Sequence, residues 1–290
     1  MKISAFTFLR NARQLGYPFI ESIKSALPLV DEFVIAIGAS QDDTLESVRA
    51  IGDPKIKIIE TNWNENMSGA GRIKGFVYGQ QKTIALFNCT GDWALYLEGD
   101  ELIHQDDIPR IRAAMERHLG NPKVEALYFN YFHFYGNGNT IAWSPQWYKR
   151  EIRVVRNTIP LWGPKGLFFS VLVDYKHSRY PRAAFADATI YHYGWVRSEE
   201  QFNEKSRQIE KLWNRSAKDY HLEEIDATTL RPFEGTHPSA ILGWLPKAEG
   251  VFKPNPAHKL TKRERKCRML SFFEKVLHRD FSRRHFIKAD

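Results

Sequence analysis

The sequence has 290 residues, 43% of them hydrophobic, which suffices for one large domain or two small ones and excludes wholesale disorder. Its two cysteines, Cys89 and Cys267, exclude a disulfide framework or a zinc motif and fit a reducing compartment. The first residues look like a short strand rather than a signal peptide, no apolar run is long enough to span a membrane, and the net charge of +8 favours an anionic partner.

Apolar strands and amphipathic helices alternate through the first half of the chain. We predict strands at residues 3–9, 33–37, 56–59 and 93–97. Between and after them, apolar residues at helical spacing predict helices at 18–27, 44–51, 73–87 and 108–119. Strands joined by helices indicate an α/β fold, a parallel sheet with helices on both faces.

The second half of the chain changes character after about residue 124. Strands are predicted at 126–135, 151–155, 167–175 and 188–196, with few helices between them, so we expect a mixed extension of the sheet. A helix is predicted at 198–213. A segment rich in proline, glycine and tryptophan follows residue 226 and leads into a basic tail.

The most informative segment follows the fourth predicted strand. Three carboxylates, Glu98, Asp100 and Glu101, are crowded around Gly99 where that strand ends. Ligands of open α/β sheets bind beyond the carboxyl ends of the strands. Crowded carboxylates repel one another unless a cation lies among them, and a divalent ion bridging to a diphosphate would satisfy them. The alternative is a solvated acidic turn, which the position at a strand end disfavours.

This segment, from Gly91-Asp92-Trp93 to Glu98-Gly99-Asp100-Glu101, resembles the family-2-like glycosyltransferases with the A-type, nucleotide-diphospho-sugar transferase fold. Residues 3–11, 40–44 and 190–197 resemble other segments of the same family, closest to a bacterial subgroup that modifies cell-surface glycans. The resemblance implies a Rossmann-like, mostly parallel central sheet, a mixed-sheet extension and a helical basic tail. We expect a catalytic domain at 1–205 and an extension at 206–290.

The resemblance implies an enzyme that transfers a sugar from a nucleotide-diphosphate sugar to an acceptor hydroxyl. Residues expected to bind the donor lie at the strand ends or carry positive charge near them: Phe8, Arg10, Ser40, Asp42, Asp43, Gln81, Glu98, Gly99, Arg153, Arg197 and Lys205. Arg197 and Lys205 are expected to stabilise the departing diphosphate.

A late histidine, His192, also matches the family and is expected to join Glu98, Asp100 and Glu101 in binding a divalent metal, Mn²⁺ or Mg²⁺. The resemblance favours inversion at the sugar, which requires a general base near the acceptor hydroxyl. Asp174, Asp187 and Glu151 are the candidates for that base, and the sequence does not rank them.

The basic tail interleaves lysines and arginines with Met269, Phe272, Phe273, Val276 and Phe281, as in a helix at an anionic membrane surface. A helix packed on the domain is the alternative. We therefore expect a cytoplasmic enzyme on the inner face of the membrane, with a glycan or lipid-linked acceptor and no nucleic-acid partner. A non-catalytic nucleotide or nucleic-acid binder and a metal-dependent nucleotidyltransferase remain alternative functions.

Overall fold

The computed structural model describes residues 1–68, 73–213, 216 and 219–289. Within them, eleven strands form one mixed sheet whose main path runs β13-β7-β6-β8-β4-β1-β2-β3. A small three-stranded sheet, β11-β10-β9, lies beside it. No described helix is long and apolar enough to cross a membrane.

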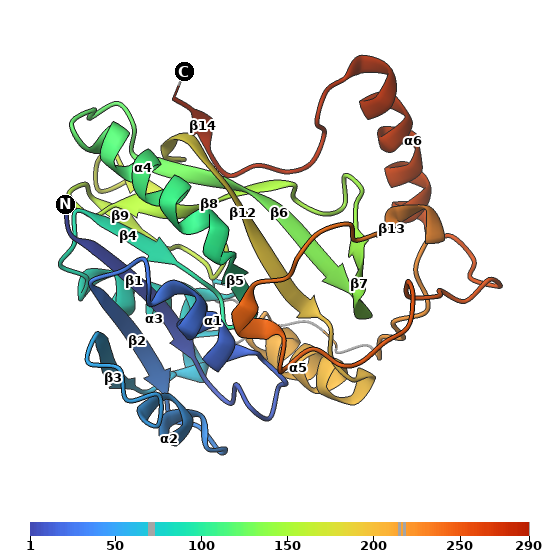
Figure 1. Cartoon of the computed structure of the whole chain (residues 1–290), viewed down its shortest axis with the longest axis horizontal. Helices are drawn as coiled ribbons and strands as arrows, with labels where there is room; N and C mark the ends of the chain where they lie inside the picture. Colours follow the sequence, from blue (N-terminus) through green and yellow to red (C-terminus); the bar gives the residue numbers. More distant parts are fainter. Residues whose placement is uncertain (69–72, 214–215, 217–218, 290) are drawn as a thin grey trace.

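The first half of the chain forms the parallel part of the sheet. Strands β1 (Ile3–Leu9), β2 (Glu32–Gly38), β3 (Ile56–Thr61) and β4 (Trp93–Tyr96) pair in parallel in the order β3-β2-β1-β4. The connecting helices are α1 (Phe19–Ala26), α2 (Thr44–Arg49), α3 (Phe76–Phe87) and α4 (Ile108–Leu119). All four carboxyl ends therefore meet at one edge of the sheet (Figure 1).

Two hydrophobic cores cover the two faces of this sheet. Alternate strand residues such as Ile35 and Leu95 pack with α1, α2 and α4. The intervening residues, such as Val34 and Tyr96, pack with α3. The alternation follows from the two-residue period of a strand, and the near-continuous apolar runs reflect burial on both sides. The expected α/β fold with helices on both faces is confirmed.

The second half of the chain extends the sheet with antiparallel pairs. Strands β6 (Ala126–Tyr135), β7 (Asn137–Ala142) and β8 (Arg150–Arg156) are antiparallel to their neighbours on the main path. The longest strand, β12 (Arg182–Trp195), is parallel to β6 and antiparallel to β5 (Glu101–Ile103). This double pairing places β12 beside the end of β4, where the carboxylates lie.

The remaining elements are short, apart from two helices. The small sheet consists of β9 (Leu161–Trp162), β10 (Ser170–Leu172) and β11 (Ser178–Arg179). Helix α5 (Glu199–Leu212) follows β12, and α6 (Lys262–Leu277) lies in the basic tail. Strands β13 (Leu230–Pro232) and β14 (Ile287–Lys288) add to the main sheet, and short 3-10 helices cover 65–68, 105–107, 227–229 and 239–241.

One predicted strand is largely wrong. Residues 167–175 were expected to be extended throughout, but only Ser170–Leu172 pair as β10. The carbonyl groups of residues 166–168 converge instead on the ammonium group of Lys82. A strand needs those carbonyls for its ladder, so this buried lysine prevents pairing there. The proposed boundary at residue 205 stays a prediction.

Candidate functional site

The carboxylate cluster lies in the turn between β4 and β5, at the carboxyl edge of the parallel sheet. The turn is buried, with Asp100 1% exposed and Glu101 fully covered. In the sheet register His192 of β12 stands between Glu101 of β5 and His133 of β6. The antiparallel β5–β12 pair thus brings the late histidine to the carboxylates.

Asp100 is the centre of this cluster. Its Oδ2 accepts hydrogen bonds from Arg197 Nη2 and Lys205 Nζ, each at 3.0 Å. Its Oδ1 is buried without a hydrogen-bond partner among the described residues and lies 3.5 Å from His192 Nε2. Burial opposes the charged form, but Lys205, His192 and Arg197 together hold the pKa of Asp100 well below its usual value. Asp100 is therefore ionised, with one oxygen still available.

His192 and His133 form a short chain of hydrogen bonds. The Nε2 atom of His133 is 2.8 Å from the carbonyl oxygen of Tyr148, so Nε2 carries a proton and donates it. Burial, with the nearby His192, lowers the pKa of His133 well below its usual value and leaves its Nδ1 as an acceptor. The two Nδ1 atoms are 2.9 Å apart, so His192 donates from Nδ1, and its other ring nitrogen, Nε2, is directed toward Asp100 Oδ1.

Glu101 and Glu98 are held by a buried arginine. Arg153 donates to both oxygens of Glu101 at 2.6 Å and to Glu98 at 3.2 Å, and Glu101 also accepts from Tyr131. Burial and the charge of Glu101 raise the pKa of Glu98 to about 7, against the effect of Arg153. The Glu98 side chain is 31% exposed, whereas both Glu101 oxygens are engaged inside the fold.

The Asp100–His192 pair has the donors that a divalent ion requires. An unpartnered carboxylate oxygen and an imidazole nitrogen face each other, a combination that suits manganese. Gly194 leaves the space, because a Cβ there would lie 2.4 Å from His192 Nε2. Among the residues described, no three His, Cys, Asp or Glu side chains are grouped to hold an ion alone. Further ligands would have to come from a bound molecule or water.

A cavity of about 370 Å³ opens at the carboxyl ends of β2 and β3. Ser40 and Asp42 line this cavity. They also connect the loop after β2 to the loop after β1, because the backbone amide of Asn11 donates to Ser40 and that of Gln14 donates to Asp42. Gly38 is also at its wall and tolerates no Cβ, which would lie 2.4 Å from the Trp63 indole.

The other predicted donor residues surround this edge in different ways. Phe8 stacks on Tyr96, and Arg10 pairs with Glu65 at 2.7 Å. Asp43 forms an exposed ion pair with Arg13 on the outer side of the loop. Gln81 is fully buried and accepts from the Thr61 hydroxyl at 2.6 Å. The structure thus gathers these residues near two strand ends, with Gln81 joining α3 to the end of β3.

The three candidates for the catalytic base lie apart from Asp100. Asp174 is exposed in the turn after β10, where it bonds His177. Asp187 is exposed on β12, five positions before His192, in the irregular stretch of the β6–β12 pairing between Phe185 and Thr189. Glu151 is buried and paired with His285 from the tail. No described contact joins any of them to the Asp100–His192 pair.

Lys82 and the hydrogen-bonding role of His133 are not among the predicted site features. Lys82 is fully buried, with its ammonium group over the rings of Tyr96 (4.0 Å) and Phe169 (3.6 Å). Burial and the charge of Arg153 lower its pKa well below the usual value. A signal was present, because Lys82 lies three positions before Ala85 and four before Leu86, on the inward face of α3.

Three comparisons place the chain among known proteins. Residues 9–170 match the model of glycosyl transferase family 2. Among solved structures, S. aureus TarS 1-349 in complex with UDP has a TM-score of 0.41 and 17% identity over 77% of this chain and 69% of that chain. Glucosyl-3-phosphoglycerate synthase from Mycobacterium tuberculosis, in complex with Mn²⁺ and UDP-Glc, has a TM-score of 0.32 and 18% identity over 46% and 44%.

This chain covers only 42% of the length of the longer S. aureus TarS structure. A search of curated proteins found no match. The family assignment accordingly rests on the family model, which includes β4 and the carboxylate turn and favours a transferase over the alternative functions. Because this match covers more than half of the chain, the protein is a glycosyltransferase that belongs to glycosyl transferase family 2.

Proposed function

We propose that this glycosyltransferase uses a nucleoside-diphosphate sugar and a divalent ion to glycosylate a hydroxyl group of a glycan or lipid-linked saccharide, with inversion. One observation carries the proposal: the free Oδ1 of Asp100 lies 3.5 Å from Nε2 of His192 at the strand edge where α/β folds bind nucleotides. The cavity at the ends of β2 and β3 is the proposed place of the nucleoside.

Asp100 and His192 would hold the ion, with Glu98 as a further ligand. When bound, a divalent cation neutralises diphosphate charge and so favours its departure. Glu101 remains a predicted ligand, but in this structure Arg153 occupies both its oxygens. Mn²⁺ and Mg²⁺ both suit oxygen ligands, and the imidazole favours Mn²⁺.

Arg197 and Lys205 have a second proposed role beside orienting Asp100. The Arg197 guanidinium is buried and has an Nε–H without a partner among the described residues, while the Lys205 side chain is 18% exposed. Both cations lie over the ring of Tyr17, which fixes their position. Fixed positive charge at this edge would stabilise a diphosphate leaving group without reorganisation during the reaction.

The general base is proposed among Asp174, Asp187 and Glu151. Loss of a general base lowers kcat by about 10²–10⁴-fold. We therefore expect one of Asp174→Asn, Asp187→Asn and Glu151→Gln to lower kcat on that scale while donor binding persists. Glu151→Gln needs a parallel unfolding measurement, because this side chain also holds the buried His285.

Donor binding is tested by thermal unfolding with UDP, GDP, CDP or dTDP, in Mn²⁺, Mg²⁺ or EDTA. At about 100 times its dissociation constant, the correct nucleotide adds about 2.7 kcal/mol of stability. We expect one nucleotide to stabilise the protein only with metal, and Asp100→Asn to abolish this effect. Asp219→Asn, an exposed control, should retain it. Equal stabilisation in EDTA, or by the Asp100→Asn variant, would contradict the proposal.

A further inference from the structure

Helix α6 presents its hydrophobic residues to solvent and its polar residues to the protein. Five apolar side chains face outward, with Phe272 61% and Val276 56% exposed; the set is Met269, Phe272, Phe273, Val276 and Leu277. The inward side instead carries Glu264, Cys267 and Glu274. A helix that only packed on a domain would have the reverse polarity. The predicted tail helix thus forms, but its phenylalanines are exposed and do not anchor it to the rest of the protein.

Ion pairs and hydrogen bonds fix this orientation. Arg268 donates to both oxygens of Asp226, at 2.7 and 2.8 Å. Glu264 accepts from the backbone amide of Asp226. Near the other end of the helix, Lys149 of the body pairs with Glu274 at 2.6 Å. The outward direction of the apolar side chains is therefore set by the polar contacts on the opposite side.

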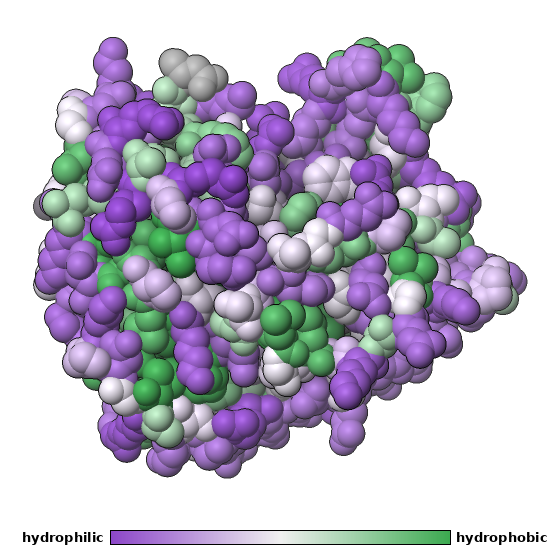
Figure 2. Space-filling model, viewed as in Figure 1, coloured by the Kyte–Doolittle hydropathy of each residue, from purple (hydrophilic) through white to green (hydrophobic). Residues whose placement is uncertain are grey.

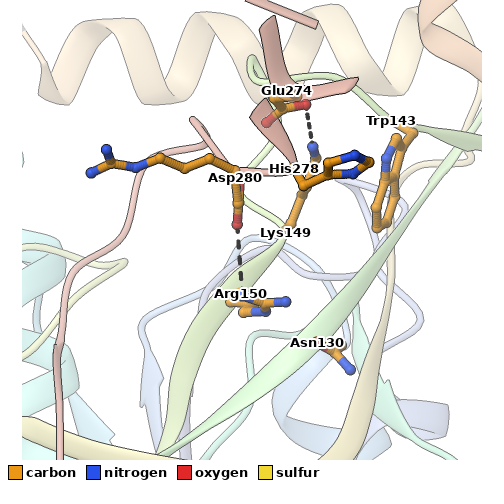
Figure 3. A pocket seen from close by; sticks show the side chains of 8 residues that line it. Asn130, Trp143, Lys149, Arg150, Glu274, His278 and Asp280 are labelled. Carbon is orange, nitrogen blue, oxygen red and sulfur yellow. Dashed lines mark hydrogen bonds and ion pairs between the residues drawn. The ribbon is translucent and has the colours of Figure 1, made fainter. Parts of the chain in front are cut away.

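A cavity of about 230 Å³ separates the second half of α6 from the sheet. Figure 3 shows Glu274 above Lys149, and Asp280 reaching toward Arg150, so two carboxylates of the tail meet two cations of the body. Both acidic residues of α6 itself are engaged on this inward side, since Glu264 accepts from the amide of Asp226 and Glu274 pairs with Lys149. Neither contributes negative charge to the outward face.

The outward face is basic where it is not apolar. Lys262, Arg265 and Lys266 precede Met269 at the spacing i, i+3, i+4, i+7, which continues through the apolar residues, so cations and apolar groups form one stripe. The cations occupy the first half of the helix and the apolar residues the second. Figure 2 shows the apolar surface gathered at the projecting tip of α6.

We propose that this stripe docks on an anionic lipid membrane, with α6 lying in the plane of the interface. The apolar side chains would enter the acyl boundary, while Lys262, Arg265 and Lys266 contact lipid headgroups. Charge complementarity selects this occupant, since the stripe has five apolar residues, three cations and no acidic residue. The docking goes beyond the transferase activity and does not depend on it, so each can fail alone.

Co-sedimentation of the full chain with vesicles tests the proposal. Phosphatidylcholine vesicles with and without phosphatidylglycerol are compared, and pelleting is expected only with the anionic lipid. Each basic residue near an anionic leaflet contributes about 1 kcal/mol, so Arg265→Gln with Lys266→Gln should weaken partitioning roughly 30-fold. Phe272→Ser with Val276→Ser should weaken it at least roughly tenfold, since both lose apolar burial.

The matched controls are Phe87→Ser, an exposed phenylalanine of α3, and Arg117→Gln with Lys123→Gln, exposed cations on and after α4. These should pellet like the unmodified chain, and all variants should keep its unfolding temperature. Unchanged pelleting of the Phe272→Ser, Val276→Ser variant would overturn the proposal. So would a dimer in sedimentation velocity that this variant dissolves, because a second copy would then cover the stripe.

Discussion

The imidazole rings of His133 and His192 meet through their Nδ1 atoms, 2.9 Å apart, although 59 positions separate the two residues. The contact connects the backbone carbonyl of Tyr148 to the metal-binding candidate. It makes His133 a positioning residue, because its acceptor nitrogen binds Nδ1 of His192 and so fixes the orientation of that ring and of its Nε2.

His133→Phe should therefore weaken metal binding without removing a ligand. Outer-shell partners of this kind typically account for about 10–100-fold in metal affinity, and we expect a loss in that range. Mn²⁺ titration in the presence of the stabilising nucleotide measures it. His133→Asn, which can present an acceptor oxygen near His192 Nδ1, should recover part of the loss. Equal affinities for all three proteins would show that the contact only packs the sheet.

Gly194→Ala should block the same site by shape. The added Cβ would lie 2.4 Å from His192 Nε2 and 3.0 Å from Asp100 Oδ2, so one of them must move. We expect at least a tenfold loss of metal-dependent nucleotide binding, equivalent to about 1.4 kcal/mol. Gly243→Ala, where the Cβ would meet no atom within 4 Å, is the matched control and should bind normally. Normal binding by Gly194→Ala would place the ion elsewhere.

Lys82→Met should destabilise the fold by about 3 kcal/mol, because three carbonyl groups lose their donor in a buried place. Residues 163–169 should also become more accessible to limited proteolysis. Urea unfolding and mapping of the first cleavage sites measure the two effects. Lys123→Met, at an exposed position, should change neither. A stable variant with the unmodified cleavage pattern would show that the loop is held by its aromatic residues alone.

Acid stability should depend on Glu32. Burial alone would raise its pKa, but hydrogen bonds from Lys57, Ser4 and Thr90 lower it to about 2. A carboxylate with a depressed pKa stabilises the folded state above its unfolded pKa, and this stability is lost as the pH falls from about 4.5 toward 2. Because Lys57 is exposed, solvent screening reduces this effect. We expect the ionised Glu32 to contribute about 2 kcal/mol to the free energy of unfolding.

Glu32→Gln should lose that contribution at pH 7 and approach the unmodified chain near pH 2. Denaturant unfolding of both proteins across this range measures the difference. Glu60→Gln, whose ion pair with Arg49 is exposed, should show little change. A constant difference between Glu32→Gln and the unmodified protein over the whole range would contradict the assignment to ionisation.

The sequence predicts the alternating first half well because the apolar period of a strand or helix is a local property. It also shows that three carboxylates follow β4 and that some cation must accompany them. It does not show that the chain itself supplies cations, since Arg153 and Lys205 lie 52 and 105 positions away from the carboxylates they bind. Such pairs depend on how distant strands and helices pack together, because Arg153 lies on β8 and Lys205 on α5, and no local pattern specifies that packing.

Strand β12 gives the tail and the site a common mechanical support. Its first residues pair with β14, and ten positions later it carries His192; β6 pairs alongside it over this stretch, except at an irregularity between Phe185 and Thr189. A force applied to the segment after α6 would therefore be transmitted along β12 toward His192. Removing residues 281–289 would release one end of it and should loosen the imidazole at the other.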